Sequence, residues 1–280
     1  MKEGALLRLG EVELRLVSDG CFWLDGGANF GLVPRVLWER VMPPDALNRT
    51  PMALRCLLIR SAGRTILVDT GYGDKLGEKQ RQILSLERSP GLPATLGLAA
   101  EEVDIVINTH LHADHCGGNT TCVDGRVVPT YPRAEYWVQR LEWADALFPN
   151  ERTRATYLPE NLRPCEDRLR LLDGDTPVTP QVRCLVTRGH TRAHQSIVIE
   201  SGEQMAIYLG DLAPLAVNLE RLTWIAANDV EPLETLETKR SLRRLALERQ
   251  ALVIFGHDPH IALGRLCEVE GGVRVVPAES

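Results

Sequence analysis

The most constraining feature of the sequence is a run of metal-ligand side chains that directly follows an apolar stretch. The segment His110 to His115 contains three histidines and one aspartate. The residues before it, Val103 to Ile107, are mostly β-branched and apolar and predict a short buried strand, whereas Gly117-Gly118 predicts a sharp turn. Loops at strand ends present functional groups in α/β folds. Because imidazole and carboxylate together suit divalent metals, zinc above all, the sequence predicts a metal site in this loop.

Composition places the chain among ordinary globular proteins. It has 280 residues, of which 44% are hydrophobic and 25% charged, enough for a large core. The net charge of -6 argues against a nucleic-acid partner, and the apolar runs are shorter than the ~20 residues needed to cross a bilayer. The seven cysteines are scattered and predict free thiols. Since the first residues also lack the pattern of a secretory signal, we expect a cytoplasmic protein.

The N-terminal part predicts a long loop. Val12 to Val17 alternates like a half-buried strand, a turn is expected at Asp19-Gly20, and no regular pattern is visible from Asp25 to about Asn48. Stretches of this kind are typical of lids, binding loops or interface arms, so we expect a lid or dimer arm at about residues 20–50. Its aromatic residues predict a pocket floor or a dimer contact, with core packing as the alternative: Phe22, Trp23, Phe30 and Trp38.

Further histidines and aspartates also follow predicted strands. Asp69 follows Thr65 to Val68, His190 follows Val182 to Val186, Asp211 follows Met205 to Leu209, and His257 follows Ala251 to Phe255, the last predicted buried strand. Because strand ends at one edge of a sheet converge, these loops are expected to assemble one site. Seven ligands are too many for one tetrahedral zinc and suit two metals about 3.5–4 Å apart that share a hydroxide. The predicted ligands are His110, His112, Asp114, His115, His190, Asp211 and His257, while Asp69 is expected to orient a metal-bound histidine.

The segment His110-x-His112-x-Asp114-His115 resembles the HxHxDH signature of the metallo-β-lactamase superfamily. Asp69, His190, Asp211 and His257 are similar to its remaining motifs, in the same order. The resemblance implies an αββα sandwich, with two mixed sheets face to face and helices outside, as a single domain over residues 1–280. It also implies the ligand sets: His110, His112 and His190 for the first metal, Asp114, His115 and His257 for the second, and Asp211 as the bridge.

Several residues argue against two branches of the superfamily and favour a third. Ala113 stands where flavodiiron oxygen reductases have glutamate, and Asp211 stands where classical zinc β-lactamases have cysteine. Three stretches are most similar to the quorum-quenching lactonases, which open N-acyl-homoserine lactones: 25–31, 189–196 and 256–259. Four residues depart from that pattern. Pro214 replaces the tyrosine that aids lactone opening in the best-known members, Arg192-Ala193 replaces Pro-Gly, and Cys116 replaces a residue that is usually alanine.

The resemblance therefore predicts a binuclear metal-dependent hydrolase in which a metal-bridged hydroxide attacks a lactone or a carboxylic ester. Zinc is expected at both positions, with iron, manganese or cobalt as alternatives, and Asp114 is expected to transfer the proton. Tyr72 joins Phe22, Trp23 and Phe30 as a candidate for the substrate pocket, with packing as the alternative for Tyr72.

Two other functions stay open at this point. One is a phosphotriesterase or a thioesterase similar to glyoxalase II that uses the same metals. The other is a metal-binding protein with little turnover. The expected partners are a small-molecule substrate and a second copy of the chain, with no nucleic acid and no membrane.

Overall fold

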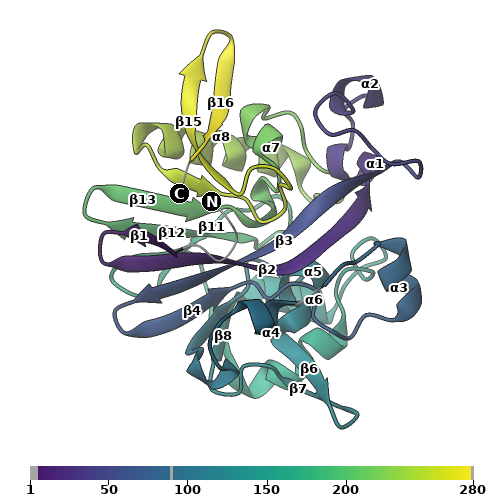
Figure 1. Ribbon diagram of the computed structural model, residues 1–280, viewed down its shortest axis with the longest axis vertical. Helices are drawn as coiled ribbons and strands as arrows, with labels where there is room; N and C mark the ends of the chain where they lie inside the picture. Colours follow the sequence, from purple (N-terminus) through teal and green to yellow (C-terminus); the bar gives the residue numbers. More distant parts are fainter. Residues whose placement is uncertain (1–5, 89–90, 279–280) are drawn as a thin grey trace.

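The computed structural model describes residues 6–88 and 91–278, and this part of the chain forms two large sheets that lie face to face (Figure 1). The first sheet consists, in spatial order, of β1 (Leu6–Leu9), β2 (Val12–Asp25), β3 (Arg49–Ser61), β4 (Arg64–Val68), β5 (Ile105–Ile107), β8 (Glu135–Gln139) and β9 (Leu169–Leu172). The second consists of β10 (Thr176–Pro177), β11 (Val182–Val186), β12 (Gln195–Ser201), β13 (Gln204–Tyr208), β14 (Leu252–Ile254), β15 (Leu263–Val269) and β16 (Gly272–Pro277). A separate hairpin is formed by β6 (Thr120–Val123) and β7 (Arg126–Pro129).

Helices cover the outer faces of both sheets (Figure 1). The second sheet is covered by α7 (Ala216–Glu220) and α8 (Pro232–Glu248), and the first by α4 (Leu92–Thr95) and α6 (Arg140–Leu147). The remaining α-helices are α1 (Gly26–Phe30), α2 (Arg35–Trp38), α3 (Glu78–Ile83) and α5 (Ala113–Cys116). Short 3₁₀ turns lie at Ala100–Glu102, Gly117–Asn119, Pro159–Asn161, Arg163–Arg168 and Gly210–Leu212. No helix in the described ranges is long and apolar enough to span a membrane.

The alternation of side chains along the strands explains the layers. In β5, Ile105 and Ile107 pack between the two sheets, whereas Val106 packs outward beside α4. In β13, Tyr208 packs between the sheets, whereas Ile207 joins the apolar cluster beneath α8. Three apolar layers therefore stack between four layers of secondary structure. This is the predicted αββα sandwich, and the fold prediction is confirmed.

The structure differs from the predictions in the N-terminal part. Strand β2 continues through the expected turn at Asp19-Gly20, because a bulge between Ser18 and Gly20 shifts the register and the ladder with β3 resumes as far as Asp25. Gly20 has a φ of +113°, which a residue with a side chain rarely adopts. The segment outside the sheet is therefore residues 26–48, shorter than the predicted loop of 20–50, and it contains α1 and α2.

The C-terminal part adds a hairpin that the sequence pattern did not reveal. Strand β14 was expected to be the last buried strand, but β15 follows it and pairs with both β14 and β16. The hairpin was missed because β16 lies at the sheet edge, where only Val275 among its residues is buried.

Candidate metal centre

The predicted site residues meet at one edge of the sandwich because of the strand directions. Strands β4 and β5 are parallel neighbours in the first sheet, and β13 and β14 are parallel neighbours in the second. Their carboxyl ends therefore deliver Asp69, the His110 to His115 segment, Asp211 and His257 to the same side of the molecule. His190 joins them from the loop between the antiparallel strands β11 and β12.

The seven predicted ligands converge in two groups. Within each group, the ligand atoms lie within 4.8 Å of one another. The first group is His110, His112 and His190, and the second is Asp114, His115, Asp211 and His257. The Asp211 carboxylate faces both, since Oδ1 lies 3.1 Å from His115 Nε2 and Oδ2 lies 3.4 Å from His190 Nε2.

Hydrogen bonds fix the orientation of three of these imidazoles. Nδ1 of each faces an acceptor that has no proton of its own, at 2.7–2.9 Å. The pairs are His115 with the Asp69 carboxylate, His190 with the Asp229 carboxylate, and His257 with the Ala53 carbonyl. Each Nδ1 therefore carries a proton, and Nε2 is the atom that faces the site and is available to a metal ion.

The distances between the imidazole nitrogens fit divalent metal ions. His115 Nε2 lies 3.0 Å from His257 Nε2, and His190 Nε2 lies 3.1 Å from His112 Nδ1. Two lone pairs at this distance repel each other unless a cation lies between them. In addition, Nε2 of His110 is buried and has no hydrogen-bond partner among the described residues. Such a group is costly to bury without a ligand, so the donor set fits two metal ions.

The ligand histidines fall into two sets that differ in the direction of the pKa shift. Burial lowers the pKa of His110 and of His112 well below the usual value, and neighbouring histidines lower it further. Burial by itself would lower the pKa of His115, His190 and His257, but the Asp211 carboxylate raises all three. The positive charge of these imidazoles in turn holds the pKa of Asp211 well below its usual range, although burial by itself would raise it. A metal ion bound at Nε2 would supply this positive charge in place of the protons. His110 and His112 are therefore neutral and Asp211 is ionised at neutral pH, as metal binding requires.

Asp69 contacts a predicted ligand and lies outside both groups. Its carboxylate accepts from the backbone N–H of Thr109 at 2.8 Å, from the Thr109 hydroxyl at 2.9 Å and from His115 Nδ1. The backbone of Asp69 has a φ of +57°, a left-handed conformation that costs free energy for most residues. This strained turn directs the carboxylate back under the His110 loop, so Asp69 holds the loop and one imidazole together.

Asp229 was missed in the sequence. It is buried in the loop before α8, where Oδ1 faces His190 and Oδ2 accepts from the Thr235 hydroxyl at 2.6 Å. No strand precedes it, so the pattern of polar residues at strand ends gave no signal.

Glu142 in α6 was also missed. Its carboxylate is fully buried, and it accepts from the Leu111 backbone N–H at 2.9 Å, the Thr191 hydroxyl at 2.6 Å and the Tyr157 hydroxyl at 3.0 Å. Leu111 lies between two predicted ligands and Thr191 follows a third, so one carboxylate joins the two loops that form the first group. Burial raises its pKa. A glutamate in a helix that also contains Arg140 and Asp145 looks like a surface residue in the sequence.

His194 contacts the backbone of Asp211 and lies outside both ligand groups. The ring is fully buried, its Nδ1 donates to the Thr187 carbonyl at 3.2 Å, and its Nε2 accepts the backbone N–H of Asp211 at 3.0 Å. Gly210 packs against the same ring: a Cβ there would lie 2.5 Å from His194 Nε2, and its φ is +55°. The Gly-Asp pair after β13 therefore depends on this neutral imidazole.

The predicted pocket residues lie in different places. Phe22 is buried, with its ring at 5.3 Å from Tyr72 and 5.7 Å from His257. Phe30 is fully buried in a stack with Trp38, with ring centroids 5.0 Å apart, so its side chain offers no surface to a substrate. Trp23 is partly exposed, as is Tyr72. The structure thus brings Phe22 and Tyr72 to the metal centre.

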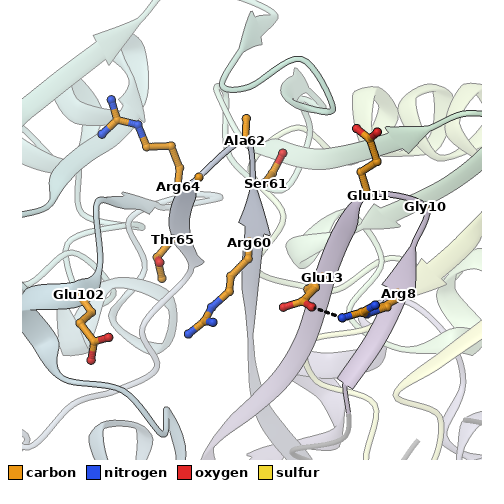
Figure 2. A pocket seen from close by; sticks show the side chains of 11 residues that line it. Arg8, Gly10, Glu11, Glu13, Arg60, Ser61, Ala62, Arg64, Thr65 and Glu102 are labelled. Atoms are coloured by element: carbon orange, nitrogen blue, oxygen red, sulfur yellow. Dashed lines mark hydrogen bonds and ion pairs between the residues drawn. The ribbon is translucent and has the colours of Figure 1, made fainter.

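Two cavities differ in their relation to the site. One of about 410 Å³ is lined by Tyr157 and Thr191, which contact Glu142, and by the exposed Phe148. A larger one of about 590 Å³ lies at the opposite edge of the sandwich, near the turn between β3 and β4 (Figure 2). It is lined largely by charged side chains, including the ion pair of Arg8 and Glu13. The smaller cavity is therefore the one beside the predicted ligands.

Comparison with known proteins identifies the family. The sequence model of the metallo-β-lactamase superfamily matches residues 49–257 of this chain. The chain therefore belongs to this superfamily. An N-acyl homoserine lactonase from Bacillus sp is 28% identical over 236 residues, which cover 79% of this chain and 84% of that protein. One from Bacillus cereus is 27% identical over 256 residues, covering 84% and 88%.

The solved structures agree with this assignment. A probable metal-dependent hydrolase from Staphylococcus aureus superposes with a TM-score of 0.90 and 25% identity, covering 98% of this chain and 99% of that one. The family predicted from the HxHxDH segment is thus confirmed, and the protein is a metal-dependent hydrolase with lactonase homologues.

Proposed function

We propose that the protein opens lactone rings, with N-acyl homoserine lactones as the substrate class, and that it uses two divalent metal ions, zinc first. The two ligand groups with Asp211 between them carry this proposal. The function named for the two Bacillus relatives supports the substrate class.

The chemistry divides between the ions and the chain. When bound, two divalent ions supply a water that ionises near neutral pH and a positive charge beside the substrate carbonyl oxygen. Asp114 has 18% of its side chain exposed, compared with 10% for Asp211 and 2% for His115, so it faces the open side of the site. We assign it the proton transfer. It takes the proton of the hydroxide that has added to the carbonyl carbon and passes it to the ring oxygen, which keeps the electron pair of the breaking C–O bond.

A second candidate is the hydrolysis of carboxylic esters, thioesters or phosphotriesters by the same residues. Pro214 favours it, because proline has no side-chain donor at the position where the lactonases that this chain resembles have a tyrosine. A metal-binding protein with little turnover is not proposed, since all seven predicted ligands are present and converge and the homologues are hydrolases.

The test joins metal content to turnover. We would purify the protein without a metal-binding tag, count the metals per chain, and follow acid release from homoserine lactones of varied acyl length. Two metals and fast ring opening are expected. His110→Ala should lose a metal and the activity, whereas His260→Ala, which changes an exposed histidine, should change neither. Two metals without lactone turnover would move the proposal to the second candidate, and fewer than one metal per chain after zinc loading would refute the binuclear site.

We also propose that residues 1–280 form one domain of a cytoplasmic protein, and that the segment 26–48 is a dimer arm or a lid. Apolar side chains on this segment are exposed, Leu32 at 102%, Leu47 at 68% and Val36 at 61%. Several exposed apolar groups on one segment are typical of contact surfaces. Light scattering at micromolar concentration tests the dimer, and a monomer there would refute it.

A further inference from the structure

The backbone around Tyr72 is packed against the segment that contains four predicted ligands. Tyr72 lies in the loop between β4 and α3, three residues after Asp69. The carbonyl of Gly71 accepts the N–H of Gly118 at 3.1 Å, and a Cβ on Gly117 would overlap the carbonyl of Tyr72. The loop therefore sits directly on the chain that follows His115, and its position is coupled to that of the metal centre.

The ring of Tyr72 is held beside the second ligand group. Phe22 presents its ring to Tyr72 at 5.3 Å and to His257 at 5.7 Å, both nearly perpendicular. Tyr72 and His257 thus pack on the same aromatic ring. Burial, and then the negative charges of Asp114 and Asp211, raise the pKa of the Tyr72 hydroxyl well above its usual value. The phenol is therefore protonated, and a hydrogen-bond donor, at neutral pH.

The hydroxyl of Tyr72 differs from those of the other tyrosines. Tyr136 donates to the Asn119 carbonyl, Tyr157 to Glu142, and Tyr208 to the Arg55 carbonyl. The Tyr131 hydroxyl is buried without a partner in the described ranges. Tyr72 is partly exposed, and its hydroxyl makes no hydrogen bond to any residue described. It is the one tyrosine near the site that has its donor available.

We propose that the Tyr72 hydroxyl donates a hydrogen bond to the substrate carbonyl oxygen as that oxygen becomes negatively charged during ring opening. This inference rests on the proposed lactonase function. Hydroxide adds to the carbonyl carbon, and the electron pair of the C=O bond moves to the oxygen. Tyr72 keeps its own proton throughout, and when the C–O bond to the ring oxygen breaks, the carbonyl re-forms. A donor aimed at developing charge stabilises the transition state more than the substrate.

The donor comes from the loop that follows β4. Pro214 offers no side-chain donor on the Asp211 side of the site. Tyr72 supplies one from the first sheet, out of the turn that begins at Asp69. The same hydrogen-bonding task is thus assigned to a different loop from the one used by the lactonases that this chain resembles.

The test compares two variants that each remove one hydroxyl. Tyr72→Phe keeps the packing on Phe22, and Tyr131→Phe serves as the matched control because its hydroxyl is also unpaired in the described structure and lies in an apolar cluster of the first sheet. Metals per chain, thermal midpoint, kcat and KM for a homoserine lactone, and the Kd of the ring-opened N-acyl homoserine are measured for each. For Tyr72→Phe we expect kcat to fall about 100-fold and the product Kd to rise about 10-fold, with metal content unchanged. Tyr131→Phe should match the wild type.

The outcomes separate the two proposals. A wild type that opens lactones and a Tyr72→Phe variant with the same kcat and product Kd would overturn the role of Tyr72 and leave the lactonase function standing. If the wild type opens no lactone, the lactonase proposal fails, and the same variants are compared on the ester, thioester or phosphotriester that is hydrolysed. Equal kcat there, or no hydrolysis of any of these substrates, overturns the role of Tyr72 as well.

Discussion

The neutral state of His194 makes the stability of the fold depend on pH in a way that one substitution can isolate. Its Nε2 accepts the Asp211 N–H, so a proton on Nε2 would place two donors against each other. Burial lowers the pKa of His194 from 6.5 to about 3. In the folded protein the ring stays neutral far below the pH at which it titrates in an unfolded chain.

The size of the effect follows from linkage. Below pH 6.5 the unfolded chain binds a proton at this position that the folded chain does not, so stability is full above pH 6.5 and is lost as pH falls toward the folded pKa of about 3. In this window, each unit by which the pH falls lowers the free energy of unfolding by about 1.4 kcal/mol. Between pH 7 and pH 5 the loss from His194 is therefore about 2 kcal/mol. Because pH 5 lies well above the folded pKa, this figure is set by the unfolded state.

The assay is urea unfolding of the metal-free protein, in chelator, at pH 7 and pH 5. The wild type is compared with His194→Gln, whose amide oxygen can still accept from Asp211, and with His260→Gln, which changes an exposed ring. The wild type and His260→Gln should each lose about 2 kcal/mol more than His194→Gln between the two pH values. An equal loss in all three proteins would refute the assignment of a neutral His194.

Two further predictions concern the support of the site, and a third concerns Lys239, a buried lysine in α8. Gly210→Ala should destabilise the protein by about 3 kcal/mol because its Cβ would meet His194, whereas Gly63→Ala, with a similar φ and open space around it, should cost about 1 kcal/mol in the same urea titration. Asp229→Ala removes the acceptor from one ligand imidazole and should weaken zinc binding about 10- to 100-fold, measured by competition with a chelating dye; unchanged zinc affinity would contradict this role. Burial lowers the pKa of Lys239 to about 8, so the unfolded chain binds more protons between pH 8 and 10.4. From pH 8 to 10 the wild type should therefore gain about 2 kcal/mol relative to Lys239→Met, and parallel pH profiles would show that the amine is not perturbed.

Patterns within short segments of the chain explain how much of the site could be predicted from the sequence. The predicted ligands are polar residues that follow apolar strands, and four of them lie within six residues. Side-chain chemistry and strand periodicity are properties of short segments, so both survive in a single sequence. Since strand ends of one sheet edge converge, the count of seven ligands already predicted two metals, and the structure brings the same residues into two groups.

The N-terminal part shows where local pattern is insufficient. Asp19-Gly20 has the composition of a turn, yet β2 continues through these residues with a bulge. It continues because β3 pairs with β2 both before and after the bulge. The pairing strand begins 24 residues after β2 ends, at Arg49. A long-range partner thus overrode a local preference, as happens commonly in sheets.

Residue types and their order are sufficient to predict the family of the fold, the candidate metal ligands and the reaction class. The groups that hold the candidate ligands in place become visible only in the folded chain. Glu142 and Asp229 are charged residues in a helix and in a loop, and their carboxylates matter because folding buries them against Leu111, Thr191 and His190. The Tyr72 hydroxyl likewise has no hydrogen-bond partner among the described residues because of how its ring packs on Phe22. Burial and hydrogen-bond satisfaction depend on contacts between distant segments, and such contacts exist only once the two sheets have closed on each other.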